Sequence, residues 1–441
     1  MAVRAVHVHT HCRALLPSPP PRAHGKPLMT TFSNPARGLS RTEFIALIAA
    51  LMALNALAID VMLPALPYMG ESLGVTVEND RHFVITAFMI GLGSTQLLIG
   101  PLSDRFGRRM PLIIGMVVYV AASLGATLAN DFETLLAMRF LQGVGCAGAR
   151  VIGQSIVRDC YSGRDMAEIM SLTFMVFMAV PIIAPSIGQV LLLTGPWQTI
   201  FLFMMLLGAA VLVWTWLRLP ETLRPENRRP LRAKVIAEGF VLVARTRQSL
   251  CYGLAGMFVF GALYGFITTA QQIFVDIYGL GVYFPIAFAG MAGMLAVAAF
   301  LNSRLVSRYG MRRISHVSML FYTGLSLVWT VLSVIGLLPF WTFFVLLVAV
   351  MFFFGTSLSN MNTLAMEPLG AVAGTASSVF GFSQTVGGAV IGTIIGQQFN
   401  GTVTPTATGY FVCGALALVC ILFAERGRLF GEGGEAARVR P

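Results

Sequence analysis

Three ionisable side chains lie well inside long apolar segments of the chain: Asp60 in the first segment, and Arg139 and Arg150 in the fourth. A charged group at the centre of a membrane helix costs about 2.5–3.5 kcal/mol, so such groups usually face a cavity or one another. Burial disfavours a carboxylate and a nearby arginine favours it. Asp60 is therefore suited to binding a proton and releasing it when its surroundings change, and we predict that it is a proton carrier.

The depth of these residues supports a pairing of Asp60 with Arg139. At 1.5 Å per helical residue, both lie in the same half of the bilayer at similar heights, whereas Arg150 lies about three turns away toward the other side. Spacing alone does not say whether Asp60 and Arg139 are in contact. The alternative for each of the three residues is a structural ion pair or a side chain that extends to the membrane surface.

A second group of charges occupies the turn Gly100-Pro101-Leu102-Ser103-Asp104-Arg105-Phe106-Gly107-Arg108-Arg109, between two segments that are otherwise almost free of charge. Glycine allows close backbone approach or a positive φ at such a turn. Its arginines do not cross a bilayer cheaply, which places the turn on the cytoplasmic side.

The composition indicates a polytopic membrane protein. Of 441 residues, 56% are hydrophobic and only 11% are charged, whereas soluble domains carry about 25% charged residues. The net charge of +11 comes from short basic clusters between apolar segments, which fits membrane topology and argues against nucleic-acid binding. Six cysteines without a C-x-x-C pair argue against a disulfide framework or a metal site.

Twelve apolar segments are each long enough to cross a hydrocarbon core of about 30 Å as a helix. Their continuous apolar character excludes a β-barrel and predicts an all-α membrane protein. We place them at 42–66, 82–102, 109–129, 132–155, 167–194, 198–218, 249–274, 284–305, 313–336, 339–364, 371–397 and 405–425.

The distribution of basic residues predicts that both termini are cytoplasmic, because almost all arginines outside the spans fall on one side. A polar linker at 219–248 divides the chain into a half at 42–218 and a half at 249–425. We expect residues 1–41 to be a disordered cytoplasmic tail. The alternatives for this segment are an organellar presequence or a true start at Met29. We expect residues 426–441 to be a second cytoplasmic tail. The halves echo one another, since Arg308–Arg313 mirrors Arg105–Arg109, but Ser307 stands where the first copy has Asp104.

Several motifs resemble those of a known family. The turn at 100–109 is similar to the signature loop between helices 2 and 3 of the major facilitator superfamily. Ala58–Pro67 resembles the first-helix motif of drug:proton antiporters, and Arg139-Phe140-Leu141-Gln142-Gly143-Val144-Gly145 resembles their R-x-x-Q-G-x-G motif. The segment around Pro181, Pro185 and Gly188 is similar to the antiporter G-P-x-x-G motif, with Ala184 in place of its first glycine. Segments at 156–163 and 365–378 resemble the Bcr/CflA-type subgroup.

The resemblance implies a fold of two pseudo-symmetric six-helix halves that work by alternating access. It implies proton-coupled export of drugs such as bicyclomycin or chloramphenicol across a bacterial inner membrane, with the proton as coupling ion, no other cofactor, and Asp60 and Arg139 in proton coupling. The chain carries no enzyme motif, and we expect a monomer in the lipid bilayer. Transport of a natural metabolite, such as an amino acid, a sugar or a siderophore, is the alternative.

The resemblance also implies a cytoplasmic gate and a central cavity. The residues of this gate are Gly100, Asp104, Arg105, Gly107, Arg108 and Asp159. We expect Asp104 to cap the N-terminus of the helix that begins near Gly374. We expect Arg105 and Arg108 to pair with Asp159 or Asp165. We expect Pro181, Pro185 and Gly188 to bend the fifth helix. Candidates for substrate contact are polar or aromatic residues within apolar spans, each with an interhelical hydrogen bond as its alternative: Gln96, Gln142, Arg150, Tyr264, Gln271, Asn362 and Gln384.

Overall fold

The computed structural model describes residues 39–228 and 233–430, and every regular element within them is helical. Twelve of the described helical segments are long and apolar enough to cross a membrane, which confirms the predicted all-α class. Their bounds lie within a few residues of the predicted spans, apart from overhangs of about one turn where helices extend beyond the apolar core.

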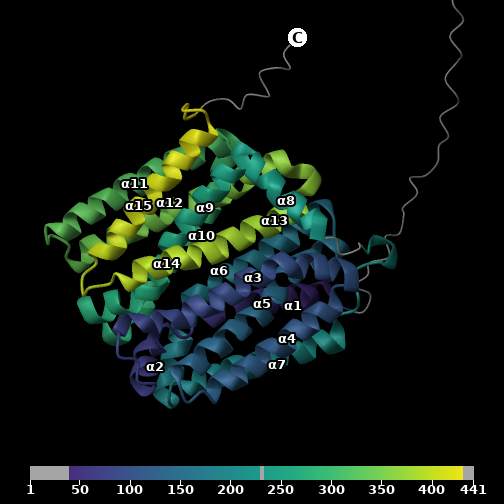
Figure 1. Cartoon of the computed structure of the whole chain (residues 1–441), viewed down its shortest axis with the longest axis horizontal. Helices are drawn as coiled ribbons and strands as arrows, with labels where there is room; N and C mark the ends of the chain where they lie inside the picture. Colours follow the sequence, from purple (N-terminus) through teal and green to yellow (C-terminus); the bar gives the residue numbers. More distant parts are fainter. Residues whose placement is uncertain (1–38, 229–232, 431–441) are drawn as a thin grey trace, which may run out of the picture. The chain divides into compact units, whose positions relative to one another are not determined.

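The helices form two groups of six spans (Figure 1). The first half consists of α1 (Arg41–Asp60), α2 (Leu66–Ser72), α3 (Phe83–Phe106), α4 (Arg109–Thr127), α5 (Phe132–Cys160), α6 (Gly163–Thr194) and α7 (Gln198–Arg218). The second half consists of α9 (Arg247–Gln271), α10 (Phe284–Tyr309), α11 (Met311–Val334), α12 (Phe340–Met366), α13 (Ala373–Phe382), α14 (Gly388–Gln397) and α15 (Thr404–Ala424).

Shorter elements connect or interrupt these helices. They are the 3-10 segments η1 (Leu63–Ala65), η2 (Glu78–His82), η3 (Pro225–Asn227), η5 (Gly281–Tyr283) and η6 (Glu367–Val372), the π-helical segments η4 (Gln272–Ile277) and η7 (Ser383–Gly387), and the linker helix α8 (Ala233–Arg245). The predicted linker at 219–248 is thus partly helical, because α8 occupies its second part and α9 begins at Arg247.

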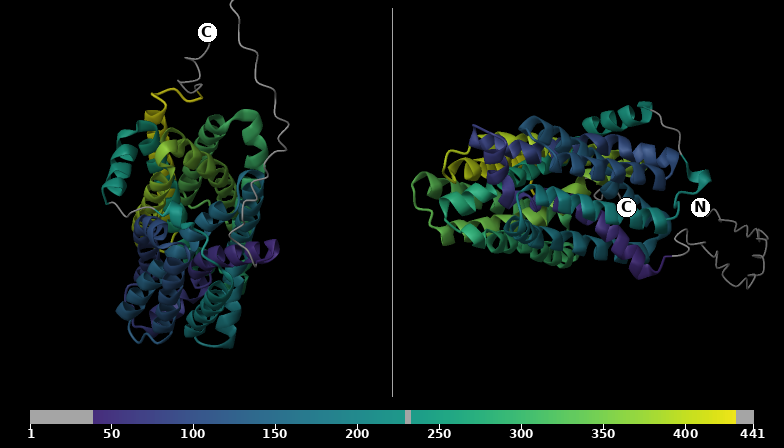
Figure 2. Two further views of the ribbon diagram at one scale, coloured as in Figure 1. Left: turned by 90° about the vertical axis from the view of Figure 1, so that its right-hand side faces the viewer. Right: turned by 90° about the horizontal axis from the view of Figure 1, so that it is seen from below.

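The two halves meet along two pairs of helices. The helix α3 packs against α13, η7 and α14, and α6 packs against α10 (Figures 1 and 2). We call the end of the bundle with residues 106–109, 218–228 and 309–311 the loop end. The end with residues 73–82, 277–283 and 398–403 is the opposite end.

The first, seventh and eleventh spans depart from a continuous α-helix beside the interface between the halves. The α-helical part of the first span ends at Asp60, and the seventh and eleventh spans contain the π-helical segments η4 and η7. Such π segments often occur at functional sites. By contrast, α6 continues as one helix through Pro181 and Pro185.

Glycine allows α6 to approach the broken first span closely. A Cβ at Gly188 would overlap the carbonyl oxygen of Val61 and would lie 3.0 Å from Pro64. In the second half, a Cβ at Gly392 would lie 2.8 Å from the backbone nitrogen of Gly265 on α9. Glycine at this position therefore allows α14 to pack closely against α9.

At each end of the described part of the chain, a residue outside the helices takes part in a hydrogen bond. The helix α1 begins at Arg41, with Ser40 accepting a hydrogen bond of 3.1 Å from the Glu43 N–H. Beyond α15, the backbone N–H of Phe430 donates to Nδ1 of His316 at 3.2 Å. The expectations for residues 1–38 and 431–441 lie outside the described residues.

Candidate transport site and gates

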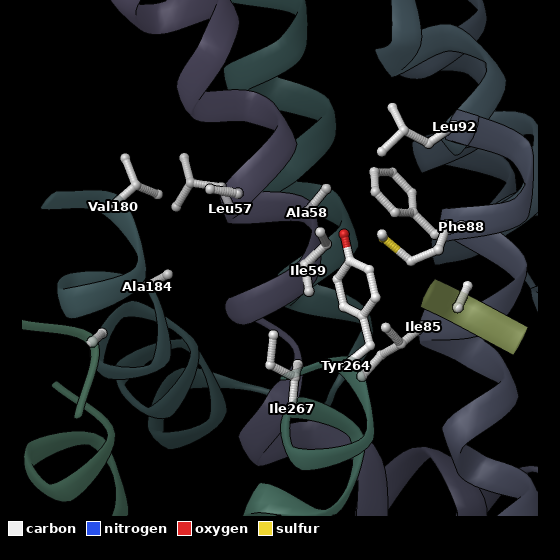
Figure 3. Close-up of a cluster of buried hydrophobic side chains, with 14 of the residues drawn as sticks. Leu57, Ala58, Ile59, Ile85, Phe88, Leu92, Val180, Ala184, Tyr264 and Ile267 are labelled. Carbon is white, nitrogen blue, oxygen red and sulfur yellow. The ribbon is translucent and has the colours of Figure 1, made fainter. Parts of the chain in front are cut away.

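Asp60 is the last residue of α1 and lies where the first half faces the second. It is 5% exposed, and its side chain makes no hydrogen bond or ion pair with any residue that the structure describes. Tyr264 on α9 of the second half is directed toward α1 at Ala58 and Ile59 (Figure 3). The Tyr264 phenol is within electrostatic range of both Asp60 and Arg150. The structure thus brings a buried carboxyl group, an arginine and a tyrosine from three different spans to one region between the halves.

Arg139 is fully buried and connects three helices of the first half. Its Nη2 donates to the carbonyl of Ala58 on α1 at 2.9 Å, its Nε donates to the carbonyl of Val84 on α3 at 3.1 Å, and its Nη1 donates to Oε1 of Gln142. The guanidinium also lies 4.6 Å from the centre of the Phe88 ring, which adds a cation–π contact. In the described part of the chain, Arg139 forms no ion pair with Asp60, and it reaches α1 two residues earlier through the backbone.

One of the predicted cavity residues lies within the first half, and another lies near the opposite end of the bundle. Gln142 is fully buried within the first half and donates to Ser123 Oγ at 2.7 Å. Gln271 lies near the opposite end, where its Nε2 is 3.5 Å from Asp276 Oδ1. These positions favour the interhelical hydrogen bond as the role of Gln142.

Three others lie close together beside the π-helical segment η7. Gln384 donates to Asn362 Oδ1 at 2.5 Å, and Thr385 Oγ1 lies 3.5 Å from Gln96 Oε1 across the interface between the halves. A Cβ at Gly381 would lie 2.8 Å from that same Gln96 oxygen. The π-helical segment therefore directs polar side chains toward both halves.

The charged turn at the loop end is organised around Arg108. Its Nε donates to Asp159 at 2.8 Å, and its Nη1 donates to Asp104 at 2.5 Å and to Ser103 Oγ at 2.7 Å. Burial opposes the charge of the guanidinium, but the hydrogen bonds and attraction of Asp159 and Asp104 outweigh it and raise the pKa of Arg108. Of the two arginines expected to pair with an aspartate, Arg108 does so, whereas Arg105 lies over the ring of Phe106 at 5.2 Å.

The expected contact of Asp104 near Gly374 stays a prediction, because the side-chain surroundings of residues 370–375 lie outside what is described. The structure does place α3 against α13, since a Cβ at Gly100 would lie 3.5 Å from Ser378 Oγ.

Glu221 is a component of this turn that the sequence reasoning missed. Its carboxylate accepts the backbone N–H groups of Arg108 at 2.8 Å and Arg109 at 3.2 Å, so it caps the N-terminus of α4. A Cβ at Gly107 would overlap Glu221 Oε2, and the φ of Gly107 is +94°. Glycine is therefore required here for two reasons. The feature of the sequence that could have identified Glu221 is its position as an acidic residue just after the sixth span.

Replacing Glu221 should weaken this end of the first half. We expect Glu221→Ala to lower the free energy of unfolding by about 1–2 kcal/mol, as for loss of a helix cap, which thermal unfolding in detergent measures. The control is Glu226→Ala, at an exposed position of η3 in the same linker. Equal melting temperatures for the two variants would show that the cap contributes nothing.

The second half has a corresponding cluster built from different acids. Arg312 pairs with Glu367 at 3.0 Å and with Glu425 at 3.2 Å, and the Tyr252 hydroxyl donates to Glu425 at 2.8 Å. The acid missing at Ser307 is thus supplied from the ends of α12 and α15. Gly310 before Arg312 has a φ of +77°, so the turn geometry repeats together with the glycine and the arginines, although Ser307 replaces the acid.

Polar residues also join the halves at the opposite end, through the side chains of Asn79, His82, Gln272 and Gln397. The sequence reasoning missed all four. Each lies at the end of a span, where a polar residue is unremarkable, and only the tertiary structure shows its partner.

Twelve membrane-length helices in two halves, with a charged turn of this construction between the second and third spans, define a secondary transporter and not an enzyme. The chain belongs to the Major Facilitator Superfamily, whose family model matches residues 48–392.

Several curated relatives are similar to this chain in sequence, and solved structures share its fold. The chain is 31% identical over 383 residues to the "Bicyclomycin resistance protein homolog" of Haemophilus influenzae, covering 86% of this chain and 94% of the relative. It is 29% identical to the "Chloramphenicol resistance protein" of Pseudomonas aeruginosa, covering 77% and 80%. The fold is similar to the crystal structure of the POT family transporter PepTSo, with a TM-score of 0.67 at 15% identity over 89% of this chain and all of that one.

Proposed function

We propose that this protein is a proton-coupled antiporter that exports drug-like compounds across the bacterial cytoplasmic membrane. The observation that carries the proposal is Asp60, a buried carboxyl group between the halves with no hydrogen bond or ion pair to any described residue. A carboxyl group without a permanent partner is free to exchange a proton when access to it changes. The names of the relatives in Haemophilus influenzae and Pseudomonas aeruginosa support drugs as the substrate class.

The orientation follows from the charges of the two ends. Arg105, Arg108, Arg109 and Arg312 lie at the loop end. Because cytoplasmic loops carry the excess of basic residues, we place the loop end in the cytoplasm. Substrate then enters from the loop end and leaves at the opposite end.

In the proposed cycle, Asp60 couples the entry of a proton to the export of substrate. A proton that arrives from the outside neutralises Asp60, and this removes the cost of holding a charge between the closed halves. Deprotonation toward the cytoplasm restores a carboxylate near Tyr264 and Arg150, where substrate binds. The Arg108 cluster holds α3, α5 and α7 together at the loop end, so that the first half moves as one body.

Transport into vesicles tests this proposal. Inside-out membrane vesicles that contain the protein receive an imposed pH gradient, and uptake of amphenicols, bicyclomycin and sulfonamides is measured. Uptake that rises with the gradient and collapses with a protonophore is the expected result. Uptake of amino acids or sugars in place of all three drug classes would show that the protein transports a natural metabolite, and drug uptake that is insensitive to the protonophore would contradict antiport.

A further inference from the structure

The two halves are joined at the opposite end by a group of hydrogen bonds around Asn79. Its Nδ2 donates to the carbonyl oxygens of Phe399 at 2.9 Å and Gln397 at 3.1 Å, just beyond the end of α14. In return, Nε2 of Gln397 donates to the backbone carbonyl of Asn79 at 3.0 Å. One residue of the first half thus makes three hydrogen bonds to a single segment of the second half.

His82 continues this group into the protein interior. Its ring is fully buried, and its Nε2 lies 2.9 Å from Oε1 of Gln272 in the π-helical segment η4. Nε2 of Gln272 donates to Asn79 Oδ1 at 3.4 Å, which leaves its Oε1 as the acceptor. The proton of His82 therefore lies on Nε2, and the imidazole donates to the second half.

The backbone of α14 approaches the His82 ring closely. A Cβ at Gly396 would lie 3.0 Å from Nδ1 of His82. One turn deeper, Thr86 Oγ1 and Thr393 Oγ1 are 2.7 Å apart. The contact between α3 and α14 at this end is therefore polar over about two turns.

Solvent reaches the outer edge of this group. A cavity of 440 Å³ opens beside it and is lined by Asn79, Phe399 and Asn400 together with Glu78 and Asp276. When the halves separate here, water entering from this cavity replaces each hydrogen bond, so that separation costs far less than breaking the bonds in an apolar medium.

We propose that Asn79, His82, Gln272 and Gln397 form the gate that keeps the opposite end closed in this conformation and that must open for substrate release. The inference rests on the proposed function for the direction of release, but the gate itself is a property of the conformational equilibrium. At this end the halves are joined by these hydrogen bonds and by an ion pair of 3.7 Å between Arg81 and Asp276. Water can replace such polar contacts when the end opens, which lowers the cost of passing between closed and open states.

A distance measurement between the halves tests the gate without any substrate. Spin labels on ketone-bearing residues introduced at Leu128 and Val282, which are exposed on different halves at this end, report the separation by pulsed electron resonance in nanodiscs and leave the cysteines intact. Asn79→Ala removes three side-chain hydrogen bonds, each of which changes an equilibrium constant by roughly two- to tenfold. The ratio of closed to open molecules should therefore fall by at least about tenfold.

The matched control is Asn400→Ala, since among the described residues the Asn400 side chain accepts hydrogen bonds only from Thr402 of its own loop. Its distance distribution should equal that of the wild type. A second test is a double-mutant cycle of His82→Ala, Gln272→Ala and the double variant. The effects of the two single variants on the ratio of closed to open molecules should not add, because both remove the hydrogen bond between His82 and Gln272. Unchanged distances for Asn79→Ala, or additive effects in the cycle, would overturn the gate. A failure of drug export in vesicles would instead overturn the proposed function and leave these distances as they are.

Discussion

Asp60→Asn should abolish uphill export driven by a pH gradient while leaving exchange of substrate down its own gradient. Asparagine has nearly the shape of a protonated aspartate but never releases a proton, so the variant is held permanently in the neutral form. The halves are then able to move with or without substrate, but no proton flux is available to drive accumulation. The measurement compares gradient-driven uptake with equilibrium exchange of the same labelled drug in the same vesicles.

The control for this substitution is Asp80→Asn, at a half-buried carboxyl group of η2 near the opposite end. It removes the same charge from the same half, and gradient-driven uptake should persist. Full gradient-driven uptake in Asp60→Asn would show that another group carries the proton. Loss of both modes would point to a structural part for Asp60 instead.

Arg139→Lys should destabilise the first half strongly although the charge is kept. The guanidinium donates along three directions at once, to Ala58, Val84 and Gln142, and its carbon lies 4.6 Å from the centre of the Phe88 ring. A lysine ammonium is a single point on a flexible chain and cannot reproduce this fork. Losing two charge-assisted hydrogen bonds in a fully buried site should cost roughly 3 kcal/mol or more. A large fall in melting temperature in detergent is the measurement.

Arg158→Lys, at an exposed position of the same helix, provides the comparison and should melt like the wild type. Transport by the Arg139 variant separates two roles for this residue. If Arg139→Lys melts normally but fails in gradient-driven uptake, the arginine acts in proton coupling, as the resemblance to drug:proton antiporters implies. If stability and uptake fall together, its main role is to join α1, α3 and α5.

The amino-acid sequence by itself determined the spans, because a helix that crosses a membrane must satisfy its backbone within one continuous apolar segment. Predicted and observed bounds coincide at 198–218, and several other spans differ by only one or two residues. The sequence also determined the two turns at Gly107 and Gly310, since positive φ and close approach are local demands on the chain. Asp60 stood out for the same kind of reason, as an acid within an apolar run.

Only the tertiary structure decided which partners these residues have. Arg139 bonds to a backbone carbonyl of α1 and not to the carboxylate of Asp60, and Glu221 reaches Arg108 across 113 positions of sequence. Asn79 and Gln397 are 318 positions apart and meet because the two halves come together at one end. Hydropathy indicates which segments are apolar enough to lie in lipid. A hydrogen bond between two segments depends on how each helix is rotated and where it lies, and this is determined by the packing of all twelve spans together.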